Sequence, residues 1–238
     1  MLRPVGKQRV AAEIVEQLRA LILKGAYAPG QKLPPERRLA EELGVNRASL
    51  REAIKSLEQM GLVKTRQGDG TRVLDFMQTA GVELVSHLIP IDGTPNLDLL
   101  GDVLEFRRLF GREVARLAAE RGSDEDLKKI EALVERGASA VEPEELLKLD
   151  FELYVALTQA GKNRVLQLLI NTIRGAVESY SAFFAAFNPP AATVRKHHKD
   201  LLRALQARDG DKAAEIADAH LKRGADQLLQ QAHPETGA

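Results

Sequence analysis

Apolar side chains recur at helical spacing in three segments at the start of the chain. The first covers about residues 10–24, and the second opens at residues 34–36, because proline is tolerated in a first helical turn. The third covers residues 47–60 and follows Asn46, a favourable N-cap. Alternating polar and apolar positions then replace the helical spacing in residues 62–74, around a turn with two glycines. Three helices followed by a hairpin predict a winged helix-turn-helix.

The pattern after Asp75 is helical throughout, without strand-like alternation or an internal repeat. We expect a connecting helix over residues 76–89 and then six amphipathic helices separated by glycine or proline breaks, over residues 97–121, 123–138, 143–160, 163–186, 191–208 and 211–230. The prediction is a mostly α-helical chain in three parts: a winged helix-turn-helix with a small β-hairpin (1–75), a connecting helix and linker (76–95), and an all-α helical bundle (96–238).

Charge is distributed unevenly along the chain, although 34 Lys and Arg balance 34 Asp and Glu to give a formal net charge of zero. Residues 1–75 carry 14 Lys and Arg against 9 Asp and Glu, a net charge of +5, so the remainder carries −5. Parts of unlike charge suggest that one of them meets an anion. Because the basic part is the helix-turn-helix, the distribution favours a nucleic acid.

What the sequence lacks excludes several classes of protein. The absence of cysteine excludes a disulfide scaffold, a thiol nucleophile and thiolate-held metal sites, and it fits a reducing compartment. The chain has no apolar signal-peptide core and no run of about 18 apolar residues, so we expect a cytoplasmic protein with no membrane partner. No histidine has a glutamate three residues before it, and neither G-x-S-x-G nor G-x-x-x-x-G-K-[ST] occurs. We therefore expect no enzymatic activity.

The third predicted helix has the residues that a DNA recognition helix needs. Its start, N-R-A-S-L-R, places Arg47, Ala48, Ser49 and Arg51 at the N-terminal end and outer face, with short side chains for entry into the major groove and guanidinium groups suited to guanine. Arg37 in the preceding helix is placed to hold a phosphate. The hairpin adds three cations and two glycines that let the backbone approach DNA: Lys64, Arg66, Arg72, Gly68 and Gly70. A merely solvated surface is the alternative, and the clustering on these elements argues against it.

Residues 25–63, GAYAPGQKLPPERRLAEELGVNRASLREAIKSLEQMGLV, resemble the N-terminal signature of the GntR family of bacterial transcription regulators. By position in that motif, the matches to the family's DNA-contacting residues are Arg37, Arg47, Ser49, Arg51 and Gly68. Ala48 and Gln67 occupy two further contact positions, where other members often carry a hydroxyl residue and a histidine. The resemblance implies a homodimer that binds an inverted-repeat operator in double-stranded DNA, with repression as its usual mode.

The helical half is similar to the effector-binding FCD domain of the FadR subfamily, in the runs V-L-E-F-R-R (103–108), A-R-L-A-A-E-R (115–121), L-D-F-E-L-Y (149–154) and G-K-N (161–163). In many relatives this domain holds a divalent metal with one Asp and three His, and the metal helps to bind a small carboxylate. The corresponding positions here are Asp150, Tyr154, His198 and His220. Asp150 and Tyr154 are one helical turn apart and so share a face.

The tyrosine leaves two hypotheses open for these four residues. They hold a metal (Zn, Ni or similar), or they form a metal-free polar cluster around an effector cavity. A tyrosine must lose a proton near pKa ~10 before it binds a metal well, which favours the metal-free hypothesis. The stretch D-F-M-Q-T-A-G-V-E-L-V (75–85) also resembles the linker of fatty-acid-responsive FadR regulators, whose metal-free pocket accepts an acyl-CoA.

Further residues of the helical half are candidates for effector contacts. Arg107 matches a family arginine and is placed to pair with an anion. Asn171 and Arg174 are cavity candidates for which a solvated or interface role is the alternative. Tyr180 begins an aromatic run that forms either ordinary core or an apolar wall for a lipid-like effector, Tyr180, Phe183, Phe184 and Phe187. We assign His87 and His197 to the surface or to a domain boundary.

The sequence therefore predicts a transcriptional repressor whose operator affinity is controlled by a small-molecule effector, a fatty acyl-CoA or a small carboxylate. One alternative is a metal-dependent, carboxylate-sensing regulator of sugar-acid or organic-acid metabolism. Another, of a different class, is a constitutive DNA-binding dimer with a structural helical domain.

Overall fold

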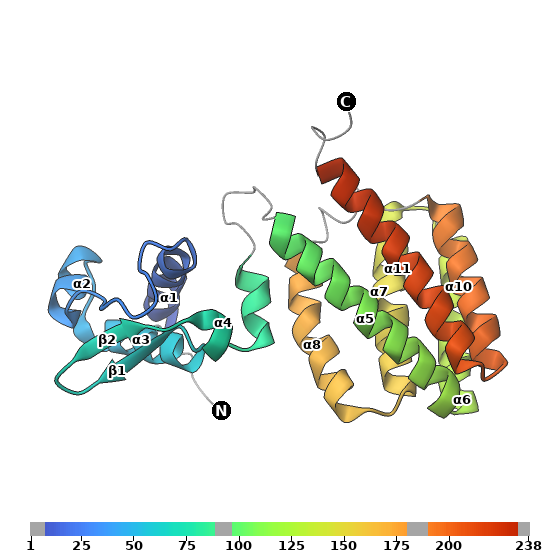
Figure 1. Ribbon diagram of the computed structural model, residues 1–238, viewed down its shortest axis with the longest axis horizontal. Coiled ribbons are helices and arrows are strands. Elements are labelled where there is room, and N and C mark those ends of the chain that lie inside the picture. The colour runs from blue at the N-terminus through green and yellow to red at the C-terminus, as the bar shows by residue number, and fades with distance from the viewer. Residues whose placement is uncertain (1–7, 89–96, 180–189, 233–238) are drawn as a thin grey trace, which may run out of the picture. The chain divides into compact units, whose positions relative to one another are not determined.

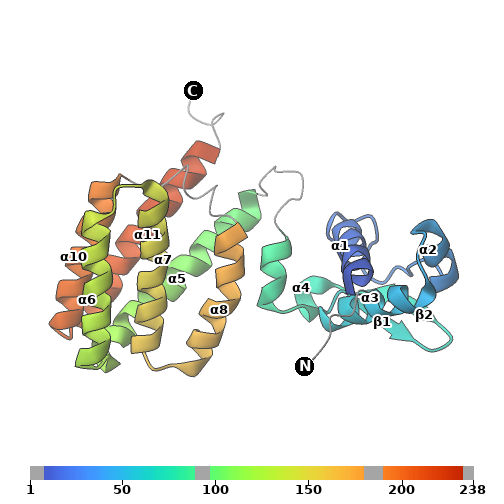
Figure 2. The ribbon, with the colours of Figure 1, turned by 180° about the vertical axis from the view of Figure 1, so that it is seen from behind.

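The computed structural model describes residues 8–88, 97–179 and 190–232, and the chain divides into two compact units, Met1–Gly93 and Thr94–Ala238. Each unit has a hydrophobic core of its own. Figures 1 and 2 show short helices with a two-stranded hairpin in the first unit, and long helices in the described part of the second.

The first unit contains the predicted three helices and hairpin. In chain order its elements are α1 (Gln8–Leu23), α2 (Glu36–Glu42), α3 (Arg47–Gln59), β1 (Val63–Arg66), β2 (Gly70–Val73), α4 (Phe76–Thr79) and the 3-10 helix η1 (Val82–His87). The two strands are antiparallel, with Val63 opposite Val73, and Lys32 forms an isolated bridge to Arg72 on β2. These elements confirm the predicted winged helix-turn-helix.

The start of α3 follows from its sequence. Oδ1 of Asn46 accepts a hydrogen bond from the backbone N–H of Ser49 at 2.9 Å, so Asn46 is the expected N-cap. Leu50, Ala53 and Leu57 are fully buried on one face of α3, which packs against α1. Burial of a leucine side chain contributes about 1.5–3 kcal/mol, so this face is committed to the core and the opposite face of α3 is left for other contacts.

The connecting helix predicted over residues 76–89 is not continuous. Helix α4 ends after one turn, Ala80 is extended with ψ of 158°, and η1 follows Gly81. The Thr79 hydroxyl donates a hydrogen bond to the carbonyl of Gly61 at 2.7 Å, which ties the end of α4 to the end of α3. A Cβ at Gly61 would lie 2.4 Å from the Thr79 carbonyl oxygen, so glycine is required for this close approach. This contact, together with the weak helix propensity of Gly81, explains the break.

The second unit is a helical bundle in its described residues. Its helices are α5 (Leu97–Arg121), α6 (Asp124–Ser139), α7 (Pro143–Ala160), α8 (Arg164–Ser179), α10 (Ala191–Gln206) and α11 (Gly210–Ala232). Their positions confirm the predicted helices, except that residues 180–186 of the fourth one lie outside the described residues. Helix α5 runs beside α11 and also packs on α7, while α6 packs on α7 and α10 (Figures 1 and 2).

The bundle core is apolar apart from one polar cluster. Val114, Ala118, Leu157, Leu201 and Leu205, from α5, α7 and α10, are all fully buried. The polar residues buried among these helices are Asp150, Thr158, His197, His198 and His220. Polar groups are generally buried only where they have partners. This cluster is therefore the candidate binding site of the second unit. Among the described residues, no helix is both long and apolar enough to cross a membrane.

Candidate functional site

Helix α3, the predicted recognition helix, exposes some of its predicted contact residues and buries one. Arg47, Ala48 and Arg51 are exposed on α3, whereas Ser49 is buried beside the Asn46 cap. Arg37 on α2 is also exposed, at 3.9 Å from the Glu41 carboxylate. Three arginines and Ala48 are thus accessible on two adjacent helices, as a major-groove interface requires.

The hairpin forms a wing in which the backbone is accessible but part of the charge is neutralised. Gln67 and Gly68 are exposed at its turn, and Gly68 has a φ of 81°, which glycine adopts without strain. Asp69 accepts hydrogen bonds from Arg72, whose Nε lies 2.7 Å away, and it also pairs with Lys32. The Arg72 guanidinium, followed by the Lys32 ammonium, holds the pKa of Asp69 well below its usual range.

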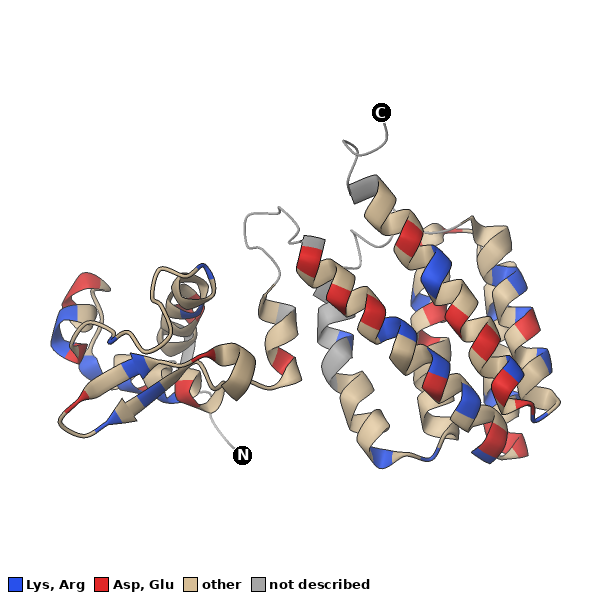
Figure 3. Cartoon of the chain, viewed as in Figure 1, with Lys and Arg blue, Asp and Glu red and all other residues tan. Residues whose placement is uncertain are grey.

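Fewer cations of the first unit are unpaired in the structure than the number of Lys and Arg in its sequence indicates. Figure 3 shows Lys and Arg on α2 and on both strands of the hairpin, with Asp and Glu among them. Lys64 pairs with Glu58 at 3.0 Å, and Arg72 is held by Asp69 and by the Gly30 carbonyl. Of the three cations predicted to flank the wing, Arg66 alone makes no ion pair within the described residues. A carboxylate next to a cation weakens that cation's attraction to phosphate.

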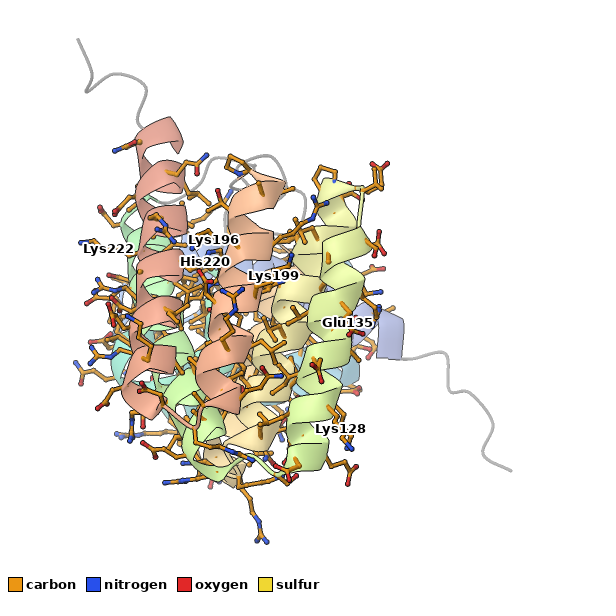
Figure 4. All side chains as sticks on the ribbon, turned by 90° about the vertical axis from the view of Figure 1, so that its right-hand side faces the viewer. Lys128, Glu135, Lys196, Lys199, His220 and Lys222 are labelled. Carbon is orange, nitrogen blue, oxygen red and sulfur yellow. The ribbon has the colours of Figure 1, made fainter. Side chains whose placement is uncertain are left out.

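In the second unit, Asp150 on α7 is the centre of the buried polar cluster. Its Oδ1 accepts a hydrogen bond from Nε2 of His198 on α10 at 2.9 Å and lies 3.8 Å from Nε2 of His220 on α11. Its Oδ2 accepts a hydrogen bond from Arg107 on α5 at 3.2 Å. Figure 4 shows His220 between α11 and α10. Four helices thus bring together residues that the sequence analysis singled out, although they are up to 113 positions apart in the chain.

His197 is a member of this cluster that the sequence analysis missed. We assigned it to the surface or a boundary, but it is 3% exposed and its ring stacks on that of His220, with centroids 3.8 Å apart and planes within 2°. The Tyr154 hydroxyl lies 3.4 Å from Nε2 of His197. The signal for burial was present in the apolar residues Val194 and Leu201, which lie three positions before and four positions after His197 on the same helical face.

Burial and neighbouring charges set the protonation states of the cluster. Burial by itself raises the pKa of Asp150, but the hydrogen bond from His198 and the nearby His and Arg107 charges outweigh it and leave that pKa well below the usual range. Burial lowers the pKa of His220 to about 4 and that of His197 well below its usual value. Burial, reinforced by the Asp150 charge, raises the pKa of Tyr154 above its usual value. At neutral pH Asp150 is therefore a carboxylate, Tyr154 keeps its phenol proton, and His197 and His220 are neutral.

The donor set fits a divalent metal. Ligand atoms of Asp150, His197 and His220 lie within 4.8 Å of one another. Two donors bound at ~2.1 Å to one ion lie about 3–3.5 Å apart, so these side chains would have to approach one another, with rotation of an imidazole ring, to hold it. Carboxylate oxygen and neutral imidazole nitrogen suit zinc, nickel and similar ions. Tyr154, which we included among the ligand positions, faces His197 and keeps its proton, so it is a poor metal ligand.

The remaining effector candidates are not part of this cluster's polar contacts. Asn171 is exposed on α8, and Arg174 is exposed with its guanidinium 5.4 Å from the centroid of the Phe151 ring. Tyr180 and the aromatic run that follows it lie outside the described residues. Arg107 is the candidate that the structure places beside Asp150.

The fold of the first unit and the exposed arginines of α2 and α3 define a winged helix-turn-helix protein that carries an all-helical second domain. Residues 10–73 match the family model for bacterial regulatory proteins of the gntR family, and residues 102–223 match the model for the FCD domain. The chain belongs to the gntR family, and its FCD domain fits the FadR subfamily. It is a DNA-binding transcriptional regulator and not an enzyme, as the sequence analysis predicted.

Individual relatives agree with this assignment. The HTH-type transcriptional regulator Mce2R of Mycobacterium tuberculosis is 36% identical over 222 residues, which cover 91% of this chain and 90% of the relative. The Glc operon transcriptional activator of Escherichia coli is 32% identical, and the match covers 76% of this chain and 72% of the relative. The solved structure described as "Lar controls the expression of the Listeria monocytogenes agr system and mediates virulence" covers 99% of this chain and 100% of its own, with a TM-score of 0.57 and 20% identity, and so shares the fold.

Proposed function

We propose that this regulator is a homodimeric repressor whose affinity for an inverted-repeat operator is controlled by a small carboxylate, bound at a divalent metal in the helical domain. The observation that carries the proposal is the buried Asp150 carboxylate, which is contacted by the Arg107 guanidinium and lies close to the imidazoles of His197, His198 and His220. We assign DNA binding to residues 1–75, the connection to residues 76–95, and effector binding and dimerisation to residues 96–238.

On the DNA side, each protomer places α3 in the major groove of one half-site. Arg47 and Arg51 supply guanidinium groups for base edges, while Arg37 holds a phosphate. Ala48, Gln67 and Gly68 are exposed beside them, and Ser49 contributes through its place at the helix start. Two-fold symmetry in the dimer matches an inverted repeat in the operator.

On the effector side, two carboxylates compete for Arg107: that of Asp150 and that of the effector. Its side chain is 38% exposed, whereas that of Asp150 is 7% exposed, so the arginine can turn away while the carboxylate stays in place. A bound divalent metal supplies positive charge and an open coordination position for a carboxylate. With a metal ion held at Asp150, the Arg107 guanidinium would no longer pair with that carboxylate and would be available for bidentate pairing with the effector carboxylate.

The polar cluster favours a small carboxylate over a fatty acyl-CoA. The side chains around Asp150 are an arginine, three histidines and a tyrosine, and an acyl chain would instead need an apolar wall. The aromatic run from Tyr180, which was the candidate for such a wall, lies outside the described residues. We therefore take the metal-dependent carboxylate sensor, one of the alternatives open at the sequence level, as the proposed function.

Melting curves of the full-length protein test the effector. Chelator-treated protein is compared with protein reconstituted with Zn²⁺, each with panels of small carboxylates and of acyl-CoA thioesters. A ligand at about 100 times its Kd stabilises the folded state by ~2.7 kcal/mol, which raises the melting temperature by several degrees. A rise with a carboxylate that requires Zn²⁺ supports the proposal. A metal-independent rise with an acyl-CoA contradicts it, and no rise with any ligand supports the constitutive dimer.

Reporter expression tests the mode of regulation. With the selected operator placed at a promoter, expression should fall when the protein is present and recover when the active carboxylate is added. Activation from the same operator, the mode named in the Escherichia coli relative, would show that the protein is not a repressor.

A further inference from the structure

Among the described residues, Nδ1 of His197 is the one buried side-chain nitrogen or oxygen that has no hydrogen-bond partner. The residue is 3% exposed, so solvent does not supply the missing partner. Nearly all buried polar atoms in folded proteins are satisfied, and an exception indicates an unfilled role such as binding an ion. The position of this nitrogen within the Asp150 cluster makes an ion the relevant partner.

The other ring nitrogen of His197 is already engaged. Nε2 lies 3.4 Å from the hydroxyl of Tyr154, which is one helical turn beyond Asp150 on α7. When Nε2–H donates its hydrogen bond to that hydroxyl oxygen, the neutral ring keeps its lone pair on Nδ1. Metal-binding histidines commonly have this arrangement, in which the second ring nitrogen donates to a fixed partner.

Three helices bring metal donors together around His197. One ligand atom each from Asp150 on α7, His197 on α10 and His220 on α11 lies within 4.8 Å of the others. We infer that Nδ1 of His197, together with Asp150 and His220, binds the divalent metal, and that Tyr154 positions the His197 ring through Nε2. This assignment rests on the metal site proposed above. Of the four positions that the family resemblance implies, it replaces Tyr154 with His197 and leaves His198 out of the ligand set.

His198 has a different role in this arrangement. Its Nε2 is hydrogen-bonded to Asp150 on α7 at 2.9 Å, and its Nδ1 lies close to Gly137 on α6, where a larger residue would crowd the ring. A metal-bound carboxylate is commonly oriented by such a hydrogen bond. His198 is thus a positioning residue for Asp150.

Metal binding must open the His197–His220 stack. An imidazole binds a metal in the plane of its ring, along the nitrogen lone pair. Two rings that are parallel within 2° and 3.8 Å apart cannot both contain one ion in their planes. One ring would therefore turn about its Cβ–Cγ bond when a metal is bound. Metal binding can thus be followed at the histidine rings themselves, without effector or DNA.

Calorimetric titration of the chelator-treated full chain with Zn²⁺ tests the assignment. His197→Phe keeps an aromatic ring for the stack but removes both nitrogens, and it should lower Zn²⁺ affinity by more than about 100-fold, beyond the usual effect of residues that only orient ligands. Tyr154→Phe should lower it by about 10-fold, because it removes the partner of Nε2. His87→Phe makes the same substitution in the other unit and should leave the affinity unchanged.

The outcomes separate this assignment from the proposed function. If wild-type protein binds no Zn²⁺, both fail. If Zn²⁺ binds and His197→Phe binds it equally well, while His198→Gln does not, His198 is the ligand and the assignment is wrong, although the metal-dependent function stands.

A second measurement needs no variant and so does not depend on one folding. In the wild-type chain labelled with ¹⁵N-histidine and loaded with ¹¹³Cd²⁺, one-bond coupling should appear at Nδ1 of His197 and at a ring nitrogen of His220. Coupling that appears at His198 and His220, with none at His197, would overturn the assignment.

Discussion

The carboxylate of Glu36, at the first residue of α2, accepts a hydrogen bond from Nε of Arg51 on α3 at 2.7 Å. These residues are 15 positions apart, and the pair joins the two helices of the helix-turn-helix across their exposed face. Because Nε is engaged, the two terminal nitrogens of the guanidinium remain available for a base. Glu36 thus limits the directions in which Arg51 can reach DNA.

The Glu36–Arg51 pair should affect how well the protein discriminates between operator sequences. Arg51→Ala should cost ~1–3 kcal/mol of discrimination at one base pair of each half-site. Glu36→Gln should relax the preference at the same base pair by a smaller amount, because the amide holds the guanidinium less firmly than the carboxylate. Binding-site selection followed by titration of single-base operator variants measures both effects.

Arg38→Ala is the matched control for that experiment. Arg38 lies on α2 and pairs with Glu42 at 2.7 Å, so it is an exposed arginine in a similar ion pair. Its loss should leave base preference unchanged. A preference that survives Arg51→Ala would show that α3 is not the recognition helix in the assigned orientation.

Asp69 limits the charge of the wing. Asp69→Asn should release Lys32 and Arg72 for phosphate contacts, since the carboxylate that pairs with both is gone. Each added phosphate contact steepens the slope of log K against log salt by about 0.9, so non-specific DNA affinity should rise at low salt and fall faster as salt increases. Fluorescence anisotropy with a non-operator duplex over a salt series gives the slope. An unchanged slope would mean that these cations do not reach DNA.

Arg107 competes with the metal for Asp150. Arg107→Met removes the competing cation while keeping much of the side-chain volume, so Zn²⁺ affinity should rise by up to about fivefold. The response to the active carboxylate should be lost, because the guanidinium no longer pairs with it. Arg108→Met is the control, since Arg108 bonds to Asp218 at 2.7 Å and should affect neither measurement. Weaker Zn²⁺ binding by Arg107→Met would contradict the competition.

Asp126 makes the stability of the bundle depend on pH. It accepts a hydrogen bond from Lys162, which contributes most, and from Ser123 in the capping box of α6, and these hold the pKa of Asp126 well below its usual value. A carboxyl group whose pKa is depressed by folding stabilises the protein above its unfolded pKa of ~3.9, and this stability is lost as the pH falls below that value. Asp126→Asn should therefore lower the melting temperature at pH 7 by the equivalent of about 1 kcal/mol.

The difference between the two proteins should shrink as the pH falls towards 3, because the Asp126 carboxyl group of the unfolded wild-type chain is then mostly protonated, which favours unfolding. Glu135→Gln, an exposed carboxylate on the same helix (Figure 4), should have little effect at either pH. A constant difference between wild type and Asp126→Asn across the whole range would show that the charge of Asp126 does not contribute.

Local signals accounted for the secondary structure and for the class of protein. Asn46 identified the start of α3, because a short polar side chain caps a helix end without help from the rest of the chain. The start of α7 at Pro143 is also local, because proline is tolerated in the first turn of a helix. The continuous connecting helix was wrong for the opposite reason. Its break depends on a contact between Thr79 and Gly61, which are 18 positions apart.

The candidate sites divide in the same way. Arg47, Arg51, Asp150 and His220 were identified by residue type and by their positions in the two family motifs. That Asp69 neutralises Lys32 could not be predicted, because hydrogen-bond partners in a hairpin depend on register and on which loop lies beside it.

The sequence by itself determined the helices, the winged hairpin, the family and the residue types available for each site, since these depend on spacing and side-chain chemistry along one segment. The tertiary structure alone decided that Nδ1 of His197 lacks a partner and that its ring lies against His220. His197 and His198 are adjacent on α10, and helical periodicity allows either to face the core. Both are buried because α7 and α11 place Asp150 and His220 next to them, and these contacts cannot be deduced from the sequence of α10 alone.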